Sequence, residues 1–533
     1  MLVLSGCADF LDINKDKNNP LTATLPQLLL TPEVMIFDGF GDGNGGVSDL
    51  TAQWAHYTVQ RGPNNFYFMD GNEFAISTAW GDVYKGALED LNIIIDQATK
   101  QGATNYSGIA KVLKAYTYAT AVDIWGIAVL NEFGKGAENF APHFDKGEDV
   151  YAACFALIDD AKNDLAQPVP TAFASTVTAP DQIYKGDVKK WTKFANSLKL
   201  KLYNQVRLTS LYNATDVAAL LTADNFISTN TEGFRLLYNS SNTPENRHPL
   251  FTEDYQGAPS NYIDPYFYVF MTGTGTNVAP NVTFNTLFTG IPDPRIPYYM
   301  YNQLATGESA QNKTAYKNGN FLSIWFASFN IDPNEGFDQG NSMTLVGLYP
   351  CGGPYDNGSG VNRSVTSGMA GAGYQRLYPW HSQLFTRAEL ALTMSTGENA
   401  ATLLTAAIAA AFAEVNEVAA QAGAPAIPAA SITAYSNAVL NLFNNAASPD
   451  KQLEILMSAK WVSNFKSGPD AYTDYRRTNY PIMFDPATDN NPLTVLNRNY
   501  PVSFPLNAIE IKTNPNAPTD RSPGSTKIFW DVN

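Results

Sequence analysis

One stretch of the chain combines the side chains that a sugar-binding site needs. Residues 61–68 read Arg-Gly-Pro-Asn-Asn-Phe-Tyr-Phe. Sugars present apolar CH faces and rings of hydroxyl groups, so a site for them pairs aromatic rings with amide or charged side chains. We therefore predict a shallow, non-catalytic site on this loop. Its ligand-binding residues would be Arg61, Asn64, Asn65, Phe66 and Tyr67.

A second aromatic stretch, residues 374–381, contributes Tyr378 and Trp380 to the same predicted site, and residues 261–268 form a third candidate. Ordinary core packing is the competing interpretation for each ring, and for a single aromatic residue it is the commoner outcome. A buried strand is equally consistent with residues 261–268. The two interpretations differ in what a truncation changes, because a platform ring affects binding and a core ring affects stability.

Catalytic and metal-binding patterns give no comparable signal. The 3 Cys and 4 His are scattered, and no zinc, EF-hand or phosphate-loop motif is present, so we expect no metal and no cofactor. Cys154 lies in an apolar helical stretch and is predicted to be a core residue. A glycan-cleaving enzyme remains an alternative, because folding can bring two carboxylates together. The acidic residues weighed for that role are Asp159, Asp160, Asp164, Glu132, Glu253 and Asp254.

Composition and net charge restrict the classes of partner that the protein is expected to bind. The 533-residue chain has a net charge of −16, which argues against binding to nucleic acid or to anionic lipid surfaces. It is 44% hydrophobic and only 16% charged, so a large ordered core is expected. The acidity is compatible with a neutral or cationic ligand, or with a soluble surface alone.

The elements that would position the site are helical. Apolar residues recur at helical spacing over 74–100 and 105–124, with Gly102 between them, and predict an antiparallel hairpin that further pairs must cover. Residues 226–383 are rich in Gly, Pro, Asn and Tyr, and predict a loop-rich insert packed on a helical frame at about 20–225 and 384–470. The other predicted helices are 24–37, 47–59, 148–166, 187–209, 214–222, 384–396, 398–421, 431–445 and 449–467.

Two motifs resemble one known family. Residues 186–200 (Gly-Asp-Val-Lys-Lys-Trp-Thr-Lys-Phe-Ala-Asn-Ser-Leu-Lys-Leu) and the segment from Lys460-Trp461 to Tyr480-Pro481 are similar to the SusD/RagB family of surface lipoproteins from Bacteroidetes. The helix end Trp125-Gly126 and residues 529–531 fit as well, while the late segment around Arg498, Phe504 and Glu510 matches the family pattern only loosely. The resemblance implies a mainly α fold of stacked tetratricopeptide-like hairpins with irregular loops on one side.

The resemblance also implies a role. Family members bind oligosaccharides, or peptides in some branches, and pass them to a SusC-like TonB-dependent transporter in the outer membrane without catalysis. The tetrapeptide ending in Cys7 resembles a lipobox, so residues 1–7 are interpreted as the remnant of a signal peptide and 8–533 as a single domain. Cys7 would then carry the acyl chains that anchor the protein at the cell surface.

The family motifs themselves are predicted to be structural. Residues 188–206 carry one apolar helical stripe, with Asp187 placed to cap the helix. Arg476 and Arg477 follow Asp470 and Asp474, which predicts an ion-pair cluster that holds the chain in place rather than a ligand site.

Overall fold

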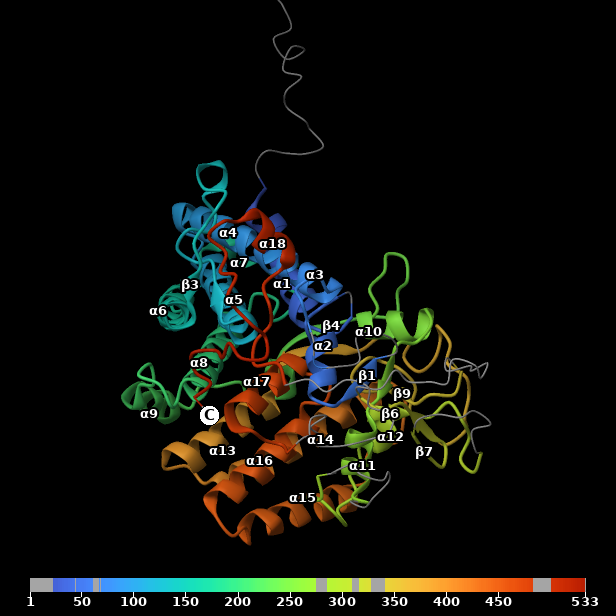
Figure 1. The fold of residues 1–533 in the computed structure, drawn as a ribbon. Coiled ribbons are helices and arrows are strands. Elements are labelled where there is room, and N and C mark those ends of the chain that lie inside the picture. The colour runs from blue at the N-terminus through green and yellow to red at the C-terminus, as the bar shows by residue number, and fades with distance from the viewer. Residues whose placement is uncertain are drawn as a thin grey trace, which may run out of the picture.

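The computed structural model describes residues 23–43, 45–60, 67, 69–274, 285–308, 316–326, 341–482 and 500–532. Its first half is a stack of helices, drawn in blue and teal in Figure 1. The C-terminal segment with α18, drawn in red, lies over this stack. The elements of this half are α1 Leu25–Phe40, α2 Ser48–Trp54, β1 Thr58–Gln60, α3 Phe74–Gly81, the π-helix η2 Asp82–Leu88, α4 Glu89–Gln101, α5 Thr104–Trp125, β2 Ile127–Ala128, η3 Gly136–Glu138, β3 Asp145–Lys146, α6 Gly147–Leu165, α7 Thr171–Ala174, α8 Val188–Gln205 and α9 Ala214–Ala223.

The predicted hairpin is present and is covered as expected. Gly102 adopts φ +68° and ends α4, and α5 then runs back against α4. Further helices continue the stack, because α6 packs on α5 and α8 packs on α6. The mainly α, tetratricopeptide-like fold is therefore confirmed. Within the stretch predicted as one helix, residues 82–88 form a π-helix instead.

The prediction of a helix over residues 47–59 is wrong at its end. Helix α2 stops at Trp54, and His56 takes a left-handed backbone conformation with φ +56°. The chain then enters β1, whose Thr58–Gln60 pair with Asn261–Ile263 of β5. A strand partner from a distant part of the chain thus overrides the local helical spacing.

The middle of the chain, in green and yellow at one side of Figure 1, carries short strands and single helical turns. Its strands pair only in antiparallel twos among the described residues: β1 with β5, β4 with β10, β6 with β9 and β7 with β8. Its elements are η4 Asn230–Glu232, β4 Phe234–Leu237, α10 Pro249–Phe251, η5 Thr252–Gln256, β5 Asn261–Ile263, α11 Pro265–Thr272, α12 Ile296–Tyr299, β6 Met300–Tyr301, β7 Tyr316–Asn318, β8 Phe321–Ser323, β9 Leu345–Val346 and β10 Tyr374–Tyr378.

Helices resume after β10. Helix α14 is long and apolar enough to cross a membrane by length and composition, but 56% of its most apolar window is buried and it packs against α13 and α15. Helix α17 was not among the predicted helices; Pro469 in its first turn is compatible with a helix start. These elements are α13 Trp380–Met394, α14 Ala400–Gln421, α15 Ala429–Asn444, α16 Pro449–Ser463, α17 Gly468–Thr478 and α18 Ala508–Thr513.

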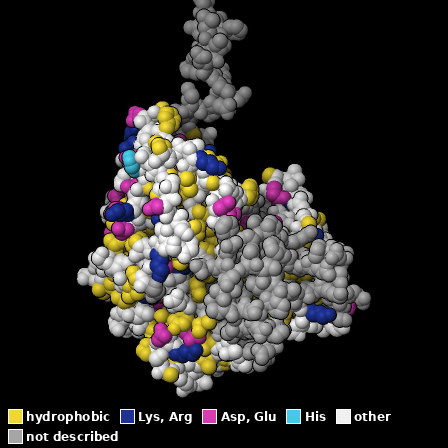
Figure 2. All heavy atoms as spheres, viewed as in Figure 1, with side chains coloured by type: hydrophobic (Ala, Val, Ile, Leu, Met, Phe, Trp, Pro, Cys, Tyr) yellow, Lys and Arg dark blue, Asp and Glu magenta, His cyan; other side chains and the backbone are white. Residues whose placement is uncertain are grey.

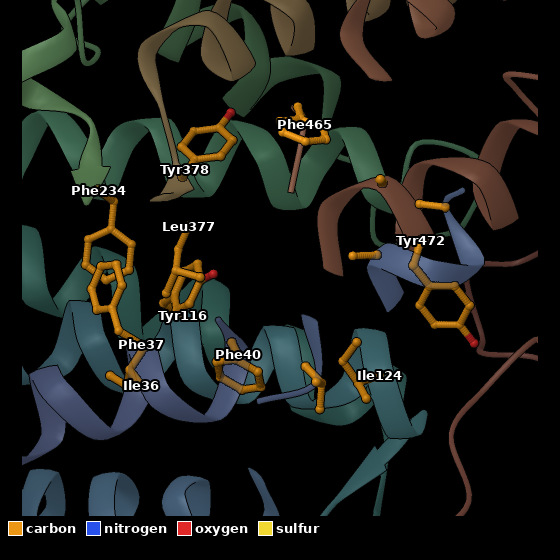
Figure 3. Packing of buried hydrophobic residues seen from close by; sticks show 14 of the residues in the cluster. Ile36, Phe37, Phe40, Tyr116, Ile124, Phe234, Leu377, Tyr378, Phe465 and Tyr472 are labelled. Atoms are coloured by element: carbon orange, nitrogen blue, oxygen red, sulfur yellow. The ribbon is translucent and has the colours of Figure 1, made fainter. Parts of the chain in front are cut away.

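An aromatic core joins these parts (Figure 3). The ring of Phe234 in β4 lies 5.0 Å from that of Phe37 in α1 and 4.9 Å from that of Tyr116 in α5. Helix α8 buries the predicted stripe against this cluster, with Phe194 stacked on Phe234 at 4.3 Å. The side chain of Asp187 accepts hydrogen bonds from the first backbone N–H groups of α8, as predicted.

The predicted ion-pair cluster is confirmed for Arg477 and Asp474, whereas Asp470 pairs with Lys201 and Arg476 donates hydrogen bonds to the backbone carbonyls of Asp123 and Val502. Arg477 of α17 binds Glu389 of α13 and Asp474 of its own helix, with Nη2 2.8 Å from each carboxylate. Arg207 reaches Glu389 at 3.2 Å, and Lys460 reaches Asp474 at 2.7 Å. Burial alone would raise the pKa of Glu389, but the two guanidinium groups hold it well below its usual range.

Candidate ligand-binding site

A pocket of about 410 Å³ opens where α2, α3 and the α10–η5 turn meet, beside the end of β1. Residues from distant parts of the chain converge here because β1 and β5 pair, which brings η5 next to α2. Its lining residues are Gly45, Asp49, Leu50, Gln60, Glu73, Phe74, Ala75, Pro249, Thr252 and Glu253.

Phe74, the one aromatic residue among the described residues of the lining, is 72% exposed at the start of α3. A β-carbon at Gly45, where φ is +82°, would lie only 2.7 Å from the edge of the Phe74 ring. The glycine therefore lets the loop pass close beside the ring. An exposed phenyl ring on a rigid helix provides a flat apolar platform for a ligand.

Three carboxylates surround this platform, and each is held by the protein itself. Oδ1 of Asp49 accepts the backbone N–H of Gly43 at 2.7 Å. Glu73 accepts the N–H groups of Asp70 at 2.9 Å and Gly71 at 3.0 Å. Glu253 accepts the Ser260 hydroxyl at 3.0 Å. Because these partners fix the carboxylates in place, their remaining lone pairs can accept hydrogen bonds from a ligand without further ordering.

Two buried carboxyl groups near Glu253, those of Asp49 and Asp254, have raised pKa values, which favours their protonated forms. Burial and the neighbouring Glu253 carboxylate raise the pKa of Asp49, although the buried ammonium of Lys466 opposes that shift. The same two causes, burial first, raise the pKa of Asp254 to about 7. Oδ1 of Asp254 accepts the N–H of Ser260 at 3.0 Å, whereas its buried Oδ2 has no hydrogen-bond partner in the part of the chain that the structure describes.

The lining predicts which ligands the pocket can accept. None of its described lining residues is Lys or Arg, so an anionic ligand would meet only like charge. The amide of Gln60, half-buried at the end of β1, can both donate and accept hydrogen bonds. The arrangement is suited to a neutral or cationic molecule with one apolar face and several hydroxyl or amine donors.

The residues predicted to bind the ligand differ in where they lie. Arg61, Asn64, Asn65 and Phe66 lie outside the described residues, as does Cys7. Tyr67 is only 4% exposed, so the exposed ring expected there is not found. Its hydroxyl lies 2.7 Å from Nε2 of His56, and its ring packs 4.7 Å from that of Phe326. The hydroxyl therefore has a buried hydrogen-bond partner and the ring has an aromatic neighbour, so Tyr67 is a core residue.

The second predicted stretch is also a packing element. Tyr378 is buried in β10, which pairs with β4, and its ring lies in the core (Figure 3). Trp380 is half-buried at the start of α13, next to Gly233 before β4, and is not among the described residues that line the pocket beside Phe74. Residues 261–268 form β5 and the start of α11, and most are buried. The structure therefore does not join Tyr378 and Trp380 to Tyr67 in one surface.

Sequence reasoning missed Asp49, Gln60, Glu73 and Phe74 as lining residues. One signal was available, because Phe74 lies off the apolar stripe of its helix and therefore points away from the core. Glu253 and Asp254 had no evident partner in the sequence, whereas the fold gives both of them partners at Ser260.

Comparisons with known proteins fit this picture. A model of the SusD-like family, described as starch-binding and associating with the outer membrane, matches residues 21–501. Search of the curated proteins gives no match. Among solved structures, a SusD homolog from Bacteroides uniformis has a TM-score of 0.69 at 17% identity, over 95% of this chain and 99% of that one. A chitin-binding SusD homolog from Flavobacterium johnsoniae has a TM-score of 0.63 at 19% identity, over 96% and 97% of the two chains.

Proposed function

The chain belongs to the SusD-like family, and from this premise we propose that it is a cell-surface lipoprotein that binds oligosaccharides and delivers them to a SusC-like TonB-dependent transporter for import. The family description supports glycan binding and the outer membrane in general terms. The single observation that carries the proposal for this chain is the pocket beside Phe74, where an exposed ring stands among fixed hydrogen-bond acceptors.

The charge of the pocket narrows the ligand class. With Asp49, Glu73 and Glu253 in its lining and no Lys or Arg among its described residues, it favours neutral or amine-bearing glycans over uronic or sulfated ones. Burying one sugar face against the Phe74 ring contributes about 1–2 kcal/mol. We therefore expect a Kd on the order of micromolar to millimolar, which lets the protein capture an oligosaccharide and release it to the transporter.

Titration calorimetry with maltoheptaose, chitohexaose and oligogalacturonate tests this proposal. We expect binding of at least one neutral oligosaccharide and none of the anionic one. Phe74→Ala should weaken binding about tenfold, since it removes the platform. Phe140→Ala is the matched control, because Phe140 is 82% exposed in the loop before β3 and lines no part of this pocket. Equal losses in both variants, or tight oligogalacturonate binding, would contradict the proposal.

The loop after β1 is part of the same test. Residues 61–66 follow Gln60, which lines the pocket, so Asn64 and Asn65 remain predicted ligand contacts. Asn64→Ala should weaken the same oligosaccharide that Phe74→Ala affects. An unchanged affinity would remove this loop from the site.

Two other functions are separated by the same samples. A peptide-binding role would show as calorimetric binding of short basic peptides in place of oligosaccharides. A glycan-degrading role draws support from Asp49, whose raised pKa beside Glu253 is a feature of acid–base carboxylate pairs. We expect chromatography of the incubated oligosaccharides to show no shorter products, because the proposed role is binding.

Anchoring and delivery have their own tests. We propose that Cys7 is acylated, so Cys7→Ala expressed in a Bacteroidetes host should move the protein from the membrane fraction to the soluble fraction. Co-purification from that host should recover a TonB-dependent transporter with the wild-type protein. A Cys7→Ala variant that stays in the membrane fraction would exclude acylation as the anchor.

A further inference from the structure

A second pocket, of about 420 Å³, lies further along the same helix as Phe74 and is built from different residues. It is bounded by α3 and η2, by the segment after β2 and by the C-terminal helix α18, which Figure 1 shows folded back over the first helices. Its lining residues are Ser77, Trp80, Gly81, Tyr84, Lys85, Val129, Phe133, Pro142, Asn507, Ile509 and Glu510.

Aromatic rings in fixed positions form its walls. The Trp80 ring lies 4.5 Å from that of Tyr84 and 5.2 Å, edge-on, from that of Trp125. Phe133 packs edge-on against Tyr84 at 5.4 Å. The hydroxyl of Tyr84 accepts the N–H of Val129 at 2.9 Å, which holds the ring in place. Trp80 and Phe133 are only half-buried, so ring surface remains open to a ligand.

Gly81 keeps this pocket open. Its backbone is an ordinary right-handed helical one, with φ −62° and ψ −47°, so no special conformation requires glycine. A β-carbon built there has no atom within 4 Å, so close packing does not require glycine either. Glycine inside a helix costs stability relative to alanine. The π-helix η2 starts at the next residue, and such segments occur frequently at functional sites.

Several polar residues line the same pocket. Lys85 is exposed, Ser77 and Glu510 are half-buried, and Asn507 holds the start of α18 through the N–H of Ile509 at 2.8 Å. Ile509 itself is 64% exposed beside the opening. A cavity of this size with aromatic walls and a few polar groups is typical of a small-ligand site.

From these contacts we propose that the second pocket binds a flat aromatic ring that carries a hydroxylated polar substituent, as in an aryl glycoside or an aromatic ester of a sugar. The ring lies against the open surfaces of Trp80 and Phe133, both of which pack on Tyr84. The polar substituent lies among the polar lining residues, where Lys85 and Ser77 can donate hydrogen bonds and Glu510 can accept them. The site is independent of the pocket beside Phe74.

Two probes that differ only in the aglycone test this assignment. Phenyl β-D-glucopyranoside and methyl β-D-glucopyranoside are titrated into the full chain by calorimetry. We expect the phenyl glycoside to bind at least tenfold more tightly, because only it carries a ring for the pocket. Saturation-transfer NMR should show stronger transfer to its phenyl protons than to its sugar protons.

Substitutions at Gly81 then locate the binding. Gly81→Leu places a side chain in the open space and should lower affinity for the phenyl glycoside at least tenfold. Gly81→Ala, which adds one methyl group, should keep affinity within about threefold, and both variants should melt no lower than wild type because Leu and Ala favour helix. Phe74→Ala should leave this affinity unchanged, whatever its effect on oligosaccharides.

Three results would overturn the assignment. They are equal binding of the two glycosides, an unchanged affinity in Gly81→Leu, and a loss of phenyl-glycoside binding in Phe74→Ala. The last result would place the phenyl ring in the first pocket. Failure of the oligosaccharide titrations alone would leave this assignment standing, because the two pockets have different walls.

Discussion

Two groups of carboxylates in this molecule differ in the charge of the residues that surround them. In the buried cluster between α8, α13 and α17, Glu389 meets Arg477 and Arg207, and its pKa falls well below the usual range. Asp49, which lines the pocket beside Phe74, and the buried Asp254 both face the carboxylate of Glu253, and burial together with that charge raises their pKa values. The first arrangement stabilises the fold, whereas for the second we propose that Asp49 offers hydrogen-bonding capacity to a ligand.

Charged side chains at the surface differ from those of the buried cluster. In the coloured part of the face shown in Figure 2, acidic and basic side chains are scattered with apolar ones between them, and the described residues there form no single basic patch. Exposed pairs, such as Lys100 with Asp96 at 2.7 Å, contribute little to stability.

The largest expected effect breaks the buried cluster. Glu389→Ala leaves Arg477 and Arg207 buried without their carboxylate, and should lower the free energy of unfolding by about 3–5 kcal/mol. Urea denaturation followed by circular dichroism measures this loss. A loss below about 1 kcal/mol would mean that water or other groups compensate both cations, and the contrast between the two groups would disappear.

The next effect sharpens the contrast between core and platform rings. Tyr67→Ala removes a buried ring and a hydrogen bond to His56, and should cost about 3 kcal/mol or more of unfolding free energy. Phe74→Ala removes a 72% exposed ring and should cost under about 0.5 kcal/mol. The same denaturation experiment compares them. If Tyr67→Ala leaves stability unchanged but abolishes oligosaccharide binding, Tyr67 is a platform after all.

The raised pKa of Asp254, next to the lining residue Glu253, should make stability depend on pH. The folded pKa of Asp254 is about 7, above its ordinary value, so the folded state binds a proton that the unfolded state releases between about pH 4 and 7. Its contribution is thus present at low pH and is lost as pH rises through 7. Asp254→Asn keeps the acceptor for Ser260 and should be more stable than wild type by roughly 1–3 kcal/mol at pH 8, with a much smaller difference at pH 4.

Glu389 should give the opposite sign. Its folded pKa is depressed, so its contribution is present above the ordinary pKa of a glutamate and is lost as pH falls below it. Thermal melts of wild type, Asp254→Asn and Glu389→Gln between pH 3 and 8 separate the two slopes. Parallel curves for wild type and Asp254→Asn would contradict the raised pKa.

The smallest effect comes from the exposed pair. Asp96→Ala on α4 should change the free energy of unfolding by no more than about 0.5 kcal/mol, and less in 0.5 M salt, because water screens both charges. It is the surface control for Glu389→Ala under identical urea denaturation. A cost near that of Glu389→Ala would show that burial does not explain the difference between the groups.

Local order is the part of this protein that the sequence determined. Helical spacing located α4 and α5, Gly102 marked the end of α4, and the stripe on residues 188–206 identified a core face, because each signal depends on neighbours within a few residues. The acidic-basic pattern of α17 likewise predicted an ion cluster. The family motifs lie in these same packed elements.

Only the tertiary structure decided the sites. The first pocket joins Asp49, Phe74 and Glu253, which are far apart in sequence and meet because β1 pairs with β5. The second joins α3 to α18 across most of the chain. The aromatic residues 67 and 378 looked like platforms in the sequence, yet partners from distant segments bury them. Whether a ring is buried or exposed depends on packing against distant segments, which residue type and local spacing do not predict.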